Sequence, residues 1–82
     1  MKIRVYSRAG DPYSDMLRNL LKYYGIQFEA VEVSRSPEKL HEMKEISGQY
    51  NTPVIKQGDK VFVGFDREKI KEILGINPEQ QK

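Results

Sequence analysis

The chain of 82 residues contains no cysteine. Because the thiolate is the group that attacks disulfides and binds soft metals, this absence excludes disulfide bonds, thiolate metal sites and thiol catalysis. Histidine is scarce too. His41 is the only one in the chain, so no second histidine or cysteine exists that could bind a metal ion with it. We therefore expect no metal centre, including no iron–sulfur cluster on protein thiolates, and we interpret His41 as a solvated helix residue.

Long apolar runs and runs of like charge are also missing. No segment approaches the roughly 18 consecutive apolar residues that would span a bilayer, and no apolar signal segment follows Met1. The 14 basic and 12 acidic residues are interspersed, so the net charge of +2 forms no basic run. We expect a cytoplasmic protein that binds neither membranes nor nucleic acid.

The length allows one small domain and no second one. Residues 77–82 are polar, follow a helix stop at Gly75 and contain Pro78. Polar chain ends of this kind lack the apolar contacts that order a segment. We therefore expect a single domain of residues 1–76 followed by a disordered tail.

Hydrophobic periodicity predicts the element order β-α-β-α-β-β-α. Only two residues separate Gly25 from the second predicted strand, and so short a return implies that the first two strands are parallel neighbours. The pattern indicates an α/β layer structure in which four strands carry helices on both faces. The predicted strands cover residues 2–7, 28–33, 54–56 and 60–63, and the predicted helices cover residues 12–24, 37–47 and a stretch between Asp66 and Gly75. Ser36 and Asp66 are the predicted N-caps of the second and third helices.

Apolar spacing also predicts which side chains form the core. In the first strand, Ile3 and Val5 share one face, and charged or amphipathic residues share the other. The helix over residues 12–24 repeats apolar residues every three or four positions. Its predicted inward residues are Met16, Leu17, Leu20, Leu21 and Tyr24, and its predicted outward residues are Arg18, Asn19 and Lys22.

The turn between the first strand and the first helix is the strongest functional signal. Asp11 is a favourable N-cap and Pro12 suits the first helical position, so a carboxylate should face the unpaired N–H groups of Tyr13 and Ser14. A helix N-terminus attracts anions by about 0.3–1 kcal/mol at exposed sites. We expect the function of the protein to lie at this turn.

Three spaced motifs extend this interpretation to the whole chain. Residues 11–14 read Asp-Pro-Tyr-Ser, residues 51–55 read Asn-Thr-Pro-Val-Ile, and residues 64–66 read Gly-Phe-Asp. In this order the chain resembles a glutaredoxin of the thioredoxin fold over residues 1–76. The family motif is Cys-Pro-Tyr-Cys, so Asp11 and Ser14 stand at the positions of both reactive cysteines. The resemblance implies strand order 2-1-3-4, with the third strand antiparallel to the first and a cis peptide before Pro53.

The resemblance also implies a binding groove for glutathione or an extended peptide. Tyr50 stands where the family often has a basic residue, and Gly64-Phe65 replaces a Gly-Gly turn. The second change resembles short glutaredoxin-like proteins that take electrons from thioredoxin reductase. Asp11 opposes the negative charge of glutathione. The positions that correspond to the family's groove are Arg8, Asp11, Tyr13, Ser14, Thr52, Pro53, Gly64, Phe65 and Asp66.

Each of these residues also has a purely structural interpretation. Asp11 is either an anion at a binding surface or a simple helix cap, and Ser14 is better explained as a hydroxyl that satisfies backbone than as a nucleophile. Thr52 either offers free backbone groups to an extended ligand or forms a rigid turn with Pro53. Tyr13 and Phe65 are either an exposed aromatic surface or packed side chains.

Three functions remain open at this point. The first is a redox-inactive binding module that keeps a glutaredoxin-like groove. The second is a thiol-disulfide oxidoreductase, serving redox homeostasis by electron transfer, whose cysteines have been replaced. The third is a small interaction scaffold with no use for the groove. Neither aspartate nor serine can form a mixed disulfide, so the sequence as it stands predicts no turnover.

Overall fold

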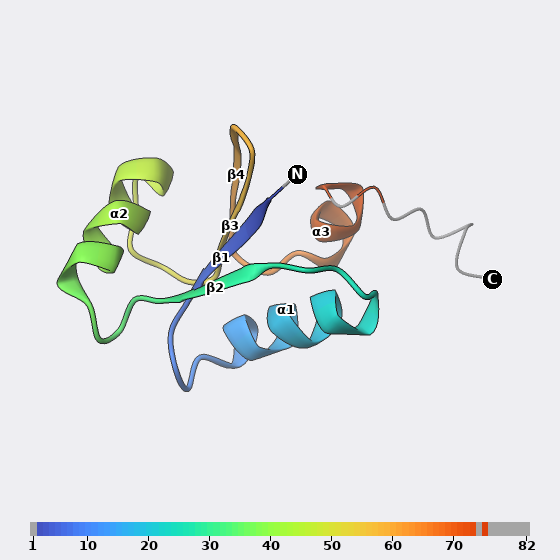
Figure 1. Cartoon of the computed structure of the whole chain (residues 1–82), viewed down its shortest axis with the longest axis horizontal. Helices are drawn as coiled ribbons and strands as arrows, with labels where there is room; N and C mark the ends of the chain where they lie inside the picture. The colour runs from blue at the N-terminus through green and yellow to red at the C-terminus, as the bar shows by residue number, and fades with distance from the viewer. Residues whose placement is uncertain (1, 74, 76–82) are drawn as a thin grey trace.

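The computed structural model describes residues 2–73 and Gly75, and the predicted tail over residues 77–82 lies outside this range. The element order agrees with the prediction, with three helices around one sheet (Figure 1). No helix within the described part of the chain is both long and apolar enough to cross a membrane. The strands are β1 (Ile3–Ser7), β2 (Glu29–Glu32), β3 (Val54–Gln57) and β4 (Lys60–Val63), and the helices are α1 (Pro12–Tyr23), α2 (Pro37–Ser47) and α3 (Arg67–Ile73).

The four strands form a mixed sheet in the order β2-β1-β3-β4. Strand β1 is parallel to β2 and antiparallel to β3, with Val5 paired to Ala30 on one side and to Ile55 on the other. Strands β3 and β4 form the antiparallel hairpin that the turn at residues 57–59 predicts. The Thr52–Pro53 peptide is cis. The structure therefore confirms the thioredoxin-type strand order and the cis bond that the resemblance implied.

One face of the sheet packs against α1 and α3. Leu17, Leu21 and Ile70 contact Ile3 and Val5 of β1, with Ile55 of β3 in the same cluster. The prediction was wrong for Met16, whose side chain remains 44% exposed. Its spacing suits the apolar side of α1, but Leu17 and Leu21 are the residues of this helix that fill the first core.

The other face of the sheet packs against α2, which confirms that helices cover both faces. Tyr6 is fully buried in this second cluster, together with Val31, Val33, Met43 and Val54. Strand β1 therefore buries side chains on both of its faces, although only Ile3 and Val5 were predicted to be apolar contacts. A central strand between two layers has no face left for solvent.

Several predicted element ends differ from the structure by one or two residues. Helix α1 ends at Tyr23 instead of residue 24, and Tyr24 is its C-cap. Strand β2 is shorter than the predicted residues 28–33, although Phe28 still packs against the first core and Val33 still donates its N–H to the Ser7 carbonyl oxygen of β1 at 2.9 Å. These differences change no strand pairing.

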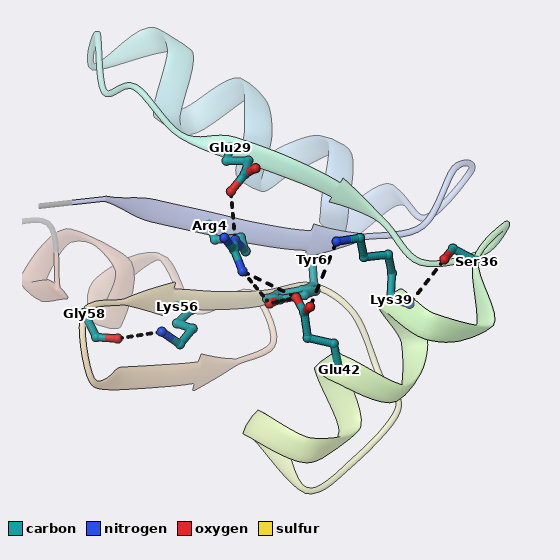
Figure 2. A network of polar contacts seen from close by, with 8 residues as sticks. All are labelled: Arg4, Tyr6, Glu29, Ser36, Lys39, Glu42, Lys56 and Gly58. Carbon is teal, nitrogen blue, oxygen red and sulfur yellow. Dashed lines mark hydrogen bonds and ion pairs between the residues drawn. The ribbon is translucent and has the colours of Figure 1, made fainter.

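A polar network joins the sheet to α2 (Figure 2). The Tyr6 hydroxyl donates to Glu42 of α2, and Arg4 lies between Glu42 at 3.4 Å and Glu29 of β2 at 2.8 Å. The hydrogen bond from Tyr6 is the main reason why the pKa of Glu42 is lowered, and burial opposes this shift. Lys39 adds a longer ion pair of 4.0 Å to Glu42. The network holds α2 in place across two strands.

Candidate functional site

Asp11 lies at the N-terminus of α1, where its carboxylate collects several donors. Oδ1 accepts the backbone N–H of Tyr13 at 3.1 Å, and Oδ2 accepts the Ser14 hydroxyl at 2.9 Å. The Thr52 hydroxyl, 41 positions along the chain, also donates to Oδ2. Asp11 is thus the predicted N-cap, and it also joins the helix to the segment before β3.

The pKa of the Asp11 carboxyl is lowered from its usual range. Partial burial acts in the opposite direction and raises it, but the hydrogen bonds from Thr52, Ser14 and the backbone of Tyr13 and Ser14 outweigh that effect. Donors that bond the charged form of an acid always favour that form. Asp11 is therefore a stable anion at neutral pH, in the position that the resemblance gives to a thiolate.

Ser14 is fully buried in the first turns of α1. The sequence predicted that its hydroxyl would satisfy backbone, and this was wrong, because the hydroxyl donates to the Asp11 carboxylate instead. An activated serine needs an adjacent base that accepts its proton. His41 is exposed on α2, which covers the opposite face of the sheet from α1, so it is not adjacent to Ser14. Among the described residues, no group of His, Cys, Asp or Glu could hold a metal ion.

Thr52 and Pro53 bring a second segment to the site. Within the described residues, neither the backbone N–H nor the backbone carbonyl of Thr52 has a backbone hydrogen-bond partner. Pro53 is buried, and its carbonyl oxygen accepts the N–H of Gly64 at 2.8 Å. This bond brings the turn before α3 next to the cis peptide. Three segments that are distant in the sequence therefore meet at the N-terminus of α1.

The remaining predicted residues divide between the site and the scaffold. The Arg8 carbonyl accepts the Asp11 N–H at 3.2 Å, and in the described part of the chain its guanidinium has no hydrogen-bond or ion-pair partner. Tyr13 is 58% exposed. Phe65 is half-buried against the first core, so it does not join Tyr13 in an exposed aromatic surface. Asp66 accepts the N–H of Glu68 at 3.1 Å, as its predicted capping role requires.

Sequence reasoning missed the contacts that support the loop before Asp11. Arg18 was predicted to face outward, but its guanidinium turns back and donates to the buried Ser7 hydroxyl at 2.7 Å. Glu32, at the end of β2, accepts the N–H groups of Ala9 at 3.1 Å and Ser34 at 3.0 Å. Hydrogen bonds from Ser34 are the main reason why the pKa of Glu32 is lowered. These contacts depend on strand order, and no local pattern marks them.

Comparison with known proteins places this geometry in a family. Residues 3–62 match the model of the Glutaredoxin family. An uncharacterised glutaredoxin-like 8.6 kDa protein in a rubredoxin operon of Clostridium pasteurianum is 29% identical over 72 residues, covering 88% of this chain and 96% of that protein. A glutaredoxin of Neisseria meningitidis is 33% identical over 64 residues, covering 77% and 75% of the two chains.

Solved structures agree with the sequence match. The glutaredoxin of Archaeoglobus fulgidus superposes with a TM-score of 0.81 at 28% identity, over 89% of this chain and 85% of that one. The glutaredoxin-like NrdH-redoxin of Escherichia coli superposes with a TM-score of 0.77 at 27% identity, over 89% and 95% of the two chains. The family match covers most of the sequence and the solved relatives share its fold, so the chain belongs to the Glutaredoxin family.

Proposed function

We propose that this glutaredoxin-like protein is a redox-inactive binding module. Its groove would hold an extended peptide, with glutathione as the smallest ligand of that kind, at Thr52 and beside the N-terminus of α1. The observation that carries the proposal is the Asp11 carboxylate, which is hydrogen-bonded to Ser14 and Thr52 in place of a thiolate. In this proposal the chain keeps a binding groove at this position and lacks the reactive sulfur.

The chemistry of disulfide exchange supports the inactive half of this proposal. Exchange begins when a thiolate attacks a disulfide sulfur and forms a mixed disulfide. The chain has no thiol, and Asp11 and Ser14 are both engaged with each other. A carboxylate held in this way is an acceptor of hydrogen bonds and cannot carry electrons between two substrates.

The backbone at Thr52 supports the binding half. Backbone N–H and carbonyl groups that have no backbone partner can pair with an incoming strand, which is how sheets capture peptides. Tyr13 is exposed at this end of α1, and Arg8 supplies a cation without a partner among the described residues. These groups suit a peptide that carries a carboxylate, which glutathione also carries.

A titration followed by NMR tests the binding half. Reduced glutathione and S-methylglutathione, which has no thiol, are each added to ¹⁵N-labelled protein up to about 10 mM. We expect both ligands to shift the amide signals of Ser14, Thr52 and Gly64 with the same millimolar affinity, since the thiol plays no part. Signals that do not move, or that move evenly over the whole chain, would refute the groove.

A matched pair of variants tests how the ligand is held. Arg8→Ala should weaken binding of S-methylglutathione about twofold to fivefold, because one exposed charge contact contributes up to about 1 kcal/mol. Arg35→Ala, an exposed arginine in the loop before α2, removes the same charge at a distance and should leave the affinity unchanged. Equal effects of the two variants would mean that only net charge matters.

Restoring the two cysteines of the family motif tests the proposal that the protein is redox-inactive. The unaltered protein should reduce a glutathione mixed disulfide no faster than buffer, and Asp11→Cys with Ser14→Cys should add measurable turnover if the groove still places a disulfide correctly. Turnover by the unaltered protein would refute the proposal. If the restored protein binds glutathione but does not reduce the mixed disulfide, the proposed binding module stands. The alternative of an oxidoreductase whose cysteines have been replaced is then excluded.

A further inference from the structure

A hollow with a volume of about 200 Å³ opens on the sheet near the start of β1, and its lining includes Lys2, Arg4, Glu29 and Lys56. These side chains share the face of the sheet that also carries Tyr6, because residues two apart on a strand and register partners on neighbouring strands point the same way. Figure 2 shows α2 at the Tyr6 end of this face and Lys56 toward the other end. The hollow therefore lies beyond α2, at the opposite end of β1 from the groove.

Strand pairing gathers positive charge at this hollow, although the sequence has no basic run. Lys56 of β3 is the register partner of Arg4 in β1, and Lys2 lies two residues before Arg4. Like charges directly opposite each other in a sheet are destabilising. Among the described lining residues, Glu29 is the one acidic group and pairs with Arg4 from the β2 side. Three basic side chains and one acidic side chain give the hollow a net charge of +2.

The guanidinium of Arg4 keeps free hydrogen-bond donors at the hollow. Its Nε donates to Glu29 at 2.8 Å, and its Nη1 lies 3.4 Å from both Glu42 and the Tyr6 hydroxyl. Its Nη2 has no hydrogen-bond partner in the part of the chain that the structure describes. An arginine head with one nitrogen unpaired can still donate two N–H groups to an anion.

The two lysines beside Arg4 lack a carboxylate partner. Lys56 donates from Nζ to the Gly58 carbonyl oxygen at 3.0 Å, which uses one of its three N–H groups. Neither Lys56 nor Lys2 forms an ion pair with any residue that the structure describes. The nearby carboxylates of Glu29 and Glu42 are instead bound to Arg4. The hollow therefore holds more positive charge than the described residues neutralise.

We propose that this hollow binds a doubly charged oxyanion of phosphate size, either free phosphate or the phosphoryl group of a small phosphomonoester. The two negative charges of the anion match the charge of the hollow, and its oxygens accept the N–H groups of Arg4, Lys2 and Lys56. The volume is several times the roughly 30 Å³ that a water molecule occupies in the liquid, so the anion enters with part of its hydration shell. This site does not depend on the function proposed for the groove.

A phosphate titration followed by NMR of ¹⁵N-labelled protein tests the site. Sodium phosphate is added up to about 50 mM near pH 7.5, with sodium chloride adjusted to hold the ionic strength constant. We expect the amide signals of Arg4, Glu29 and Lys56 to shift with a dissociation constant on the order of 10⁻³ M, because a few exposed charge contacts hold the anion. Acetate, which carries a single charge, should bind at least about fivefold more weakly.

A matched pair of charge reversals tests which residues hold the anion. Lys56→Glu should weaken phosphate binding at least about tenfold, since it removes one attraction and adds one repulsion. The variant should fold, because it places opposite charges across β1 and β3. Lys60→Glu makes the same change in the same hairpin, but Lys60 pairs with Gln57 and points to the other face of the sheet. It should therefore leave the affinity within about twofold of the original.

Glycerol 3-phosphate distinguishes the two sources of the anion. Binding at least about threefold tighter than inorganic phosphate identifies a phosphomonoester as the ligand, and equal or weaker binding identifies free phosphate. The proposal is overturned if the signals of the hollow do not move, or if phosphate shifts only Ser14 and Thr52 at the groove. Equal binding of acetate and phosphate, or equal effects of Lys56→Glu and Lys60→Glu, would overturn it as well.

Discussion

At the scale of single residues, the substitution of a cysteine by Asp11 changes what the N-terminus of α1 can do. A thiolate needs the positive end of a helix to stay ionised, whereas a carboxylate is ionised anyway and uses the same N–H groups as a cap. Asp11 adds the hydroxyls of Ser14 and Thr52 to this cap. Where the family motif has a reactive thiolate, this chain has a carboxylate that stabilises the start of α1.

Removing the Asp11 side chain tests this contribution. Asp11→Ala should lower the free energy of unfolding by about 1–3 kcal/mol, because it removes the N-cap and leaves the fully buried Ser14 hydroxyl without its acceptor. Urea denaturation at pH 7 measures this difference. Asp59→Ala, an exposed aspartate in the β3–β4 turn, should change stability by less than about 0.5 kcal/mol. Similar losses for both variants would remove the special role of Asp11.

The lowered pKa of Asp11 predicts how this contribution depends on pH. The stability it supplies is complete above the unfolded pKa of 3.8 and is lost as pH falls through the lower folded value. The advantage of the native protein over Asp11→Asn should therefore be largest near pH 7 and should shrink below about pH 4. Urea denaturation at pH 7 and pH 2.5, each with added salt to screen general charge repulsion, measures the two differences. A constant difference would contradict the lowered pKa.

At the scale of elements, each helix relates differently to the sheet. Helix α2 has one fully buried side chain, Met43, and the partly buried Leu40 and Ile46 pack against the same cluster. Glu42 adds polar contacts with Tyr6 and Arg4. Helix α1 buries three residues completely. Met43 is therefore the centre of the apolar attachment of α2.

Truncating Met43 tests how α2 is attached. Met43→Ala should lower the free energy of unfolding by about 2–5 kcal/mol through lost burial and the cavity left behind. His41→Ala, on the exposed side of the same helix, should cost less than about 0.5 kcal/mol. If Met43→Ala does not fold, Met43→Leu keeps the volume and should remain within about 1.5 kcal/mol of the native protein. A mild effect of Met43→Ala would place the attachment in the polar network instead.

At the scale of the whole molecule, the sheet order predicts where the structure opens first. Strand β1 is paired on both sides and covered on both faces, whereas β4 is paired on one side only. Amide hydrogen exchange should therefore be slowest in β1, around Val5 and Tyr6, and much faster along the outer side of β4. NMR after transfer to D₂O measures this order. Equal protection of β4 would mean that a partner covers that edge.

Much of the fold follows from local sequence signals. Asp11, Ser36 and Asp66 each begin a helix as predicted, because a short polar side chain before an apolar repeat satisfies N–H groups that have no other partner. Gly48 ends α2 with a positive φ of 75°, as a helix-terminating glycine should. Strand order came from the resemblance to glutaredoxins and not from periodicity, which cannot distinguish one neighbour from another.

The candidate site was predictable in its location but not in its bonds. The sequence identified Asp11, Ser14 and Thr52 as neighbours through the family motif, but it assigned Ser14 the wrong acceptor. It left open whether Tyr13 and Phe65 are exposed or packed, and the structure leaves Tyr13 exposed and packs Phe65 against the first core. The hydrogen-bond partner of a side chain depends on how the elements pack against one another. The spacing of residues along one element does not predict that partner.

The sequence alone determined that this protein has no thiol of its own and where its helices begin, since both depend on residue type and on neighbours within a few positions. Only the tertiary structure decided that Thr52 would reach Asp11, that Arg18 would turn back to Ser7, and that Phe65 would pack against the first core. These contacts join residues that lie far apart in the chain. These contacts form because the strand order and the packing of the helices on the sheet determine which side chains lie next to each other. Neither property can be predicted from a single segment of the sequence.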